Sequence, residues 1–116
     1  MFNQDETNAI RRVAARLDEE RPSKSLLGVI TDKATEPNST YYDLCLEIDI
    51  RAKEGKLASE DNPQENQERA KMFRELLEMF MGDSIDDQKK RAAALRYVNK
   101  LRGFPYREPP KQGGTT

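Results

Sequence analysis

Residues 63–102 read PQENQERAKMFRELLEMFMGDSIDDQKKRAAALRYVNKLR, and this stretch decides the fold class. Pro63 is typical of the first residue of a helix, and apolar residues then recur at helical spacing until Gly82 ends the run. Ser84 with Asp87 three residues later predicts the cap of a second helix. Because the connection is short, the stretch predicts two antiparallel helices, an αα-hairpin over about residues 63–102.

The N-terminal part of the chain favours further short helices. A first helix is expected over about residues 4–20, capped by Asn3 and ended by Pro22. It is indicated by apolar residues at i, i+3, i+4 and i+7: Ile10, Val13, Ala14 and Leu17. The next apolar segment, residues 26–30, fits either two turns of helix or a brief strand, since Gly28 weakens both.

The segment DLCLEIDIR, residues 43–51, fits two patterns. Its apolar residues alternate as in a strand, which gives an α+β alternative with an antiparallel pair at 26–31 and 43–50. The same residues also fit helical spacing, as a stripe at Leu44, Cys45 and Ile48 and a second stripe at Tyr42, Leu46 and Ile50. We favour the helix, and with it an all-α bundle of four to five short helices.

Length and composition indicate one lean domain. The chain has 116 residues, of which 35% are hydrophobic and 35% are charged, so the core is expected to be thin. We assign residues 1–103 to a single helical domain. Residues 104–116 contain three prolines and two glycines, and they predict an extended arm that becomes disordered toward the C-terminus.

Cys45 is the only cysteine, which excludes an internal disulfide and favours a buried thiol in a reducing compartment. Neither a leader-like start nor an apolar run long enough for a membrane span is present in the sequence. We therefore expect a cytoplasmic protein that does not contact membranes.

The sequence does not indicate an enzyme. It contains no histidine, which removes the common acid–base, nucleophile and zinc systems, and it contains no phosphate-binding glycine loop. A magnesium site could be assembled from Glu75, Glu78, Asp86 and Asp87, but acidic residues near a helix start are explained by the helix dipole alone. We expect no catalytic residues, no cofactor, no metal and no small-molecule substrate.

The distribution of charge is the strongest functional signal. Residues 1–87 hold 12 Lys+Arg against 20 Asp+Glu, whereas residues 88–116 hold 8 against 1. Basic residues at the end of a helix complement its dipole, but this excess is larger than capping requires. The C-terminal helix and arm are therefore expected to bind an acidic surface.

These patterns predict a small interaction protein, such as a regulator, adaptor or inhibitor, that binds an acidic protein partner. Nucleic acid is the alternative ligand for the same basic and aromatic strip, and self-association into an oligomer remains open. The candidate partner-binding residues form an apolar Met/Phe face and a basic strip. They are Met72, Phe73, Leu76, Met79, Phe80, Lys89, Arg96, Tyr97, Lys100, Arg102, Phe104, Tyr106, Arg107 and Lys111.

Overall fold

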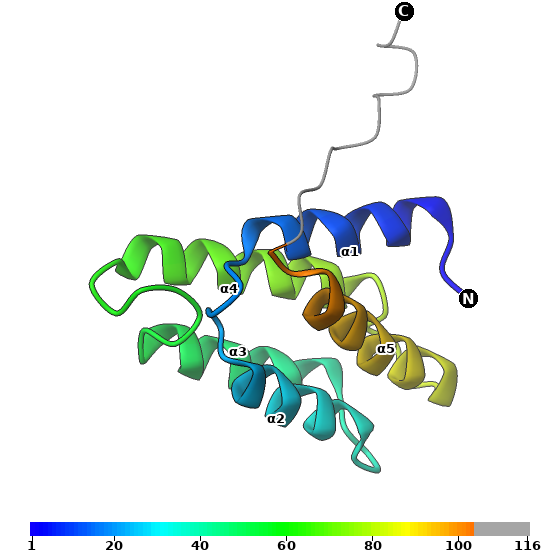
Figure 1. Ribbon diagram of the computed structural model, residues 1–116. Coiled ribbons are helices and arrows are strands. Elements are labelled where there is room, and N and C mark those ends of the chain that lie inside the picture. The colour runs from blue at the N-terminus through cyan, green and yellow to red at the C-terminus, as the bar shows by residue number, and fades with distance from the viewer. Residues whose placement is uncertain (104–116) are drawn as a thin grey trace, which may run out of the picture.

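The computed structural model describes residues 1–103, which form five α-helices and no strand (Figure 1). The helices are α1 (Gln4–Arg16), α2 (Lys24–Thr35), α3 (Tyr41–Lys53), α4 (Pro63–Glu78) and α5 (Ile85–Leu101). The all-α prediction is confirmed, and the two segments of the alternative strand pair are helical in α2 and α3. The arm predicted at 104–116 lies outside the described residues.

Each helix begins after a polar residue whose side chain accepts a hydrogen bond from the backbone N–H three residues later. Such caps satisfy N–H groups that have no partner inside the helix, and they fix where each helix starts. The five caps are Asn3, Ser23, Thr40, Asn62 and Ser84.

The first helix is shorter than predicted and ends at Arg16 rather than near residue 20. Leu17 has an extended backbone, and its side chain is buried in the core. The chain therefore leaves the helix at Leu17, because turning there both buries this side chain and directs the chain toward α2.

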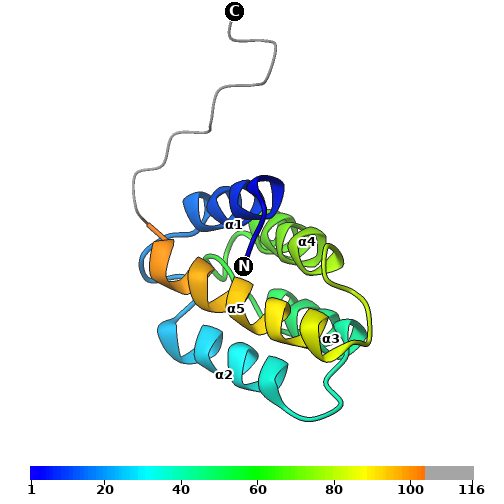
Figure 2. The same ribbon diagram turned by 90° about the vertical axis from the view of Figure 1, so that its right-hand side faces the viewer.

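The five helices form a closed ring in the order α1, α4, α3, α2, α5 and back to α1, and α4 and α5 also touch each other. Figure 2 shows α5 between α1 and α2, with α3 beside α4. One hydrophobic cluster fills the ring, and every helix contributes to it. Its fully buried large residues include Leu27, Ile30, Leu44, Ile48, Phe73, Leu77, Phe80, Leu95 and Val98.

The packing of α4 and α5 differs from the predicted hairpin. The two helices are consecutive, but they contact each other less than any other packed pair, because α1 lies between them in the ring. Helix α4 ends at Glu78, earlier than Gly82, and the chain turns so that Phe80 enters the core. The connection is thus longer than the Gly82–Asp83 turn expected from the sequence.

A buried arginine on α5 holds this connection in place. The Arg91 guanidinium donates to the carbonyl oxygens of Phe80 and Gly82 through Nη1, the latter at 2.8 Å, and to that of Ser39 through Nη2 at 3.2 Å. Arg91 is only 1% exposed. It therefore links the α4–α5 connection to the α2–α3 loop.

A buried asparagine on α4 organises the α3–α4 loop in a similar way. The Asn66 Oδ1 accepts the backbone N–H groups of Leu57 and Ala58, both at 2.9 Å. Its Nδ2 donates to the carbonyl oxygens of Ser59 at 2.9 Å and Asn62 at 3.0 Å. One fully buried side chain thus satisfies four backbone groups of a loop that has no secondary structure of its own.

Glu65 on α4 couples the loop side of the bundle to α1 and makes stability depend on acid pH. A hydrogen bond from Arg16 is the main cause that lowers the pKa of Glu65 from 4.5 to about 2, and Arg69 adds to it. A carboxylate with a lowered folded-state pKa stabilises the fold above its unfolded pKa, and that stabilisation disappears as pH falls through the folded value.

We therefore expect the free energy of unfolding to fall more steeply between pH 4.5 and about 2 in the wild type than in a Glu65→Gln variant. Urea titrations followed by circular dichroism at a series of pH values measure this difference. Glu68→Gln, which removes an exposed carboxylate on the same helix, is the control and should leave the slope unchanged. Parallel curves for the wild type and Glu65→Gln would contradict the assignment.

Candidate protein-binding groove on α5

The outer face of α5 carries the basic residues that the sequence singled out. Lys89, Arg96 and Lys100 are all exposed, while the opposite face of the helix is buried in the ring. Tyr97 is half-exposed next to them, and its ring lies 6.0 Å from the Lys100 ammonium and 5.9 Å from the Phe2 ring.

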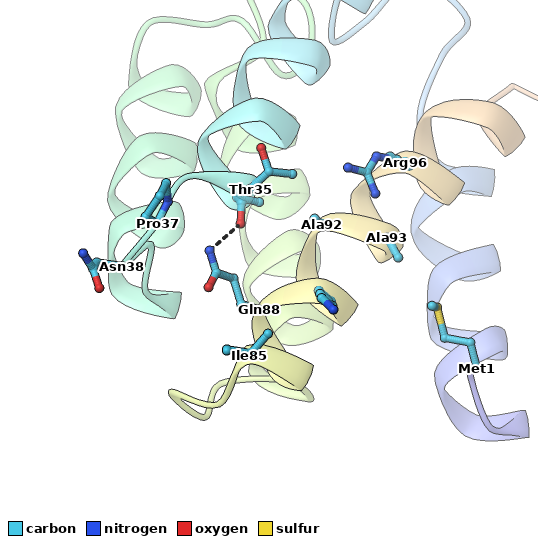
Figure 3. Close-up of a pocket in the computed structure, with 11 residues that line it drawn as sticks. Met1, Thr35, Pro37, Asn38, Ile85, Gln88, Ala92, Ala93 and Arg96 are labelled. Carbon is cyan, nitrogen blue, oxygen red and sulfur yellow. Dashed lines mark hydrogen bonds between the residues drawn. The ribbon is translucent and has the colours of Figure 1, made fainter.

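A hollow of about 630 Å³ lies along this face, and we call it the α5 groove (Figure 3). Its lining residues are Met1, Ala34, Thr35, Pro37, Asn38, Ile85, Gln88, Lys89, Ala92, Ala93 and Arg96. In Figure 3 the α5 helix lies in the middle, with Thr35 and Pro37 on one side and Met1 on the other. Ala92 and Ala93 leave space where larger side chains would fill it.

The wall formed by α2 is fixed to α5 by Gln88. Its Nε2 donates to the carbonyl oxygen of Ala34 at 3.5 Å (Figure 3). It also donates to the carbonyl oxygen of Glu36. These bonds hold the C-terminal end of α2 against α5. The α5 groove therefore depends on the packing of the two helices and not on α5 alone.

Two smaller hollows continue the groove past Met1. One of about 220 Å³ is lined by Met1, Ala93, Arg96, Tyr97 and Lys100. The other, of about 380 Å³, is lined by Met1, Phe2, Thr7, Ile10, Arg11, Tyr97 and Leu101. Met1 lines all three hollows, so they lie next to one another around this residue.

The charged side chains that line these hollows in the described part of the chain are all basic. Among residues 1–103, no Asp or Glu lines any of the three hollows, although the first 87 residues hold 20 acidic residues. Lys89, Arg96 and Lys100 form no ion pair within residues 1–103. Their charges are therefore available to a ligand, together with apolar surface from Ile85, which is 71% exposed.

The structure corrects the predicted Met/Phe face. Phe73, Leu76 and Phe80 are at most 2% exposed and belong to the core, so the folded chain does not present them to a partner. Met72 is only partly buried against the core, and Met79 is 43% exposed; both line a separate hollow beside α1 and not the α5 groove. The apolar stripe of α4 is buried because α1 and α3 both pack against this helix.

One member of the predicted basic strip is also corrected. Arg102 is 7% exposed, and its guanidinium donates to the carbonyl oxygen of Pro22, so it ties the end of α5 to the α1–α2 connection. Burial lowers the pKa of Arg102. The remaining predicted residues, Phe104, Tyr106, Arg107 and Lys111, lie outside the described part of the chain.

Sequence reasoning missed the residues that turn a basic helix face into a groove. Pro37 and Asn38 come from the α2–α3 loop, and neither was among the predicted partner-binding residues. Ile85, at the first position of α5, is 71% exposed and was not among the predicted partner-binding residues. One sequence signal could have predicted that Ile85 is exposed: it directly follows the N-cap Ser84, and the first turn of a helix often projects beyond the core.

Comparison with known proteins finds no match to a family model, a curated protein or a solved structure. Within residues 1–103, none of the helices is long and apolar enough to cross a bilayer. The same residues contain no cluster of three or more side chains of the metal-ligating types. The function therefore has to be argued from the α5 groove itself.

Proposed function

We propose that this chain is a non-enzymatic interaction protein and that the α5 groove binds an acidic segment of a partner protein. The observation that carries the proposal is the combination of an apolar hollow with three cations that have no ion pair in the described residues. Apolar burial would supply most of the affinity, and the cations would supply orientation and the rate of encounter.

The spacing of the cations suits a peptide that runs along α5. Lys89, Arg96 and Lys100 are separated by seven and four residues, which corresponds to about 10 Å and about 6 Å along a helix axis. A partner segment with a large apolar residue seated over Ala92 and Ala93 would place carboxylates within reach of these charges. Ile85 and Met1, both largely exposed, border the same position.

Nucleic acid is the competing ligand for the same cations, and the apolar lining favours protein over it. Base stacking needs open aromatic faces, whereas the Tyr97 ring already contacts Phe2 and lies near Lys100. The α5 groove has alanines, Ile85 and Pro37 in its lining, and these suit an apolar side chain better than a phosphate backbone.

A display library of random peptides, selected on the immobilised protein, tests the proposal. We expect the selected peptides to combine Asp or Glu with a large apolar residue. Their affinity should fall about tenfold or more for the Lys89→Glu/Arg96→Glu protein, because both reversed charges would repel the peptide. Fluorescence anisotropy with the labelled peptides measures the loss.

The matched control is Lys24→Glu/Lys71→Glu, which makes the same change in net charge at two exposed lysines outside the α5 groove. It should keep the wild-type affinity. Selection of peptides without acidic residues, or an equal loss in both double variants, would refute the proposal. Labelled DNA and RNA serve as a second arm: tight, strongly salt-dependent binding that only the groove variant loses would identify a nucleic-acid ligand instead.

A further inference from the structure

Helix α3 carries an apolar stripe that the bundle does not cover. Tyr42, Leu46 and Ile50 lie at i, i+4 and i+8, so they follow one face of the helix. They are 70%, 63% and 43% exposed, while Leu44 and Ile48 on the opposite face are fully buried. The sequence pattern had suggested a helix buried on two sides, and only one of those sides is covered within residues 1–103.

The charges on this face are ordered along the helix. Asp43 lies beside the stripe in the first turn, where its carboxylate accepts the Thr40 N–H at 3.1 Å. Lys53 lies in the last turn, is exposed, and forms no ion pair among the described residues. Arg51, by contrast, is paired with Glu47 and Glu54 on its own helix.

We propose that the α3 stripe is the contact surface for a second copy of this chain, with the two α3 helices packed antiparallel about a two-fold axis near Leu46. In this arrangement Leu46 packs on its own copy, and Tyr42 of one chain packs on Ile50 of the other. The charges without an ion pair in the described part of the chain are self-complementary, because Asp43 at the start of one helix lies toward Lys53 at the end of its copy, while Asp49, which stands level with the copy's Asp43, is paired with Arg74 of its own chain. Asp43 then lies within about one helical turn of the copy's Lys53.

The size of the stripe sets the expected strength of the dimer. A helix of 13 residues is about 20 Å long, so one helix pair buries less than the 1,200 Å² or so that is typical of stable complexes. We therefore expect a weak, reversible dimer. The α5 groove is on another part of the ring and takes no part in this contact.

Sedimentation velocity over about 10 μM to about 1 mM protein tests for the dimer. The wild type should shift with concentration from the 13.3 kDa chain toward twice that mass. Leu46→Asp should weaken the dimer about tenfold or more, since two buried carboxylates would face each other at the axis. Val29→Asp, at an exposed apolar residue of α2, is the matched control and should dimerise as the wild type does.

Cysteine cross-linking tests the orientation, in a Cys45→Ser background that removes the only native thiol. An antiparallel pair predicts a disulfide dimer for Leu46→Cys alone and for a mixture of Tyr42→Cys with Ile50→Cys chains. Tyr42→Cys alone should cross-link poorly. A wild type that stays monomeric at the highest concentration, a dimer unaffected by Leu46→Asp, or preferential cross-linking of Tyr42→Cys to itself would overturn the proposal.

Discussion

Arg91→Ala is expected to lower the free energy of unfolding by about 3–5 kcal/mol. The substitution removes the donors for three carbonyl oxygens, those of Ser39, Phe80 and Gly82, from a site where the side chain is 1% exposed. A carbonyl left without a donor in the interior costs about 1–3 kcal/mol, and the vacated volume adds a packing loss.

The positive charge of the buried Arg91 is stabilised without a carboxylate partner in residues 1–103. Arg91 forms no ion pair within the described range, and its positive charge is met by the carbonyl dipoles of Phe80 and Gly82 in the α4–α5 connection and of Ser39. Arg91→Met should therefore recover part of the packing but not the hydrogen bonds, and it should fall between the wild type and Arg91→Ala.

Urea denaturation followed by circular dichroism measures these losses. Arg96→Ala is the control, since it removes an exposed arginine from the same helix and should change stability by less than about 0.5 kcal/mol. Similar losses for Arg91→Ala and Arg96→Ala would mean that water replaces the guanidinium, and that the α4–α5 connection does not depend on it.

Asn66→Ala is the second substitution with a large expected effect, a loss of about 2–4 kcal/mol. The asparagine side chain is the partner of four backbone groups in the α3–α4 loop, at Leu57, Ala58, Ser59 and Asn62. Leu57 and Ala58 are themselves buried, so their N–H groups cannot turn to water without opening the loop.

Asn66→Asp separates the two halves of this network. It keeps an acceptor for the two N–H groups, but it sets a carboxylate oxygen against the two carbonyls and should be nearly as destabilising at neutral pH. Gln67→Ala, at the exposed neighbouring position, is the control. Hydrogen exchange reports the loop directly: protection of the Leu57 and Ala58 amides should disappear in both Asn66 variants and persist in Gln67→Ala.

Local chemistry explains why the helices were predictable from the sequence. Pro63, Ser84 and the residues around them carry their own start signals, and the 3.6-residue period of α4 needs no tertiary information. Residues 43–51 were ambiguous because their apolar residues lie on every face, and the outcome was decided by packing. Helix α3 became the better solution once α2 and α4 could cover its Leu44 and Ile48 side.

The candidate binding residues were less predictable than the helices, because the exposure of a side chain depends on how the five helices pack. Lys89, Arg96 and Lys100 were placed correctly on one outer face by their spacing alone. Arg102 fits the same sequence rule, yet the α1–α2 connection covers it. Phe73 and Phe80 were indistinguishable from a binding face until α1 was known to pack on α4, a contact between residues about 60 positions apart.

The position of α1 in the ring has a consequence for folding. Among the described helices α1 packs only on α4 and α5, the last two to be synthesised. Contacts between distant parts of a chain form slowly, because a long loop must close first. Ile10, Val13 and Leu17 are therefore expected to stay uncovered on the ribosome until α4 and α5 have emerged, so that among the described helices α1 waits longest for its packing partners.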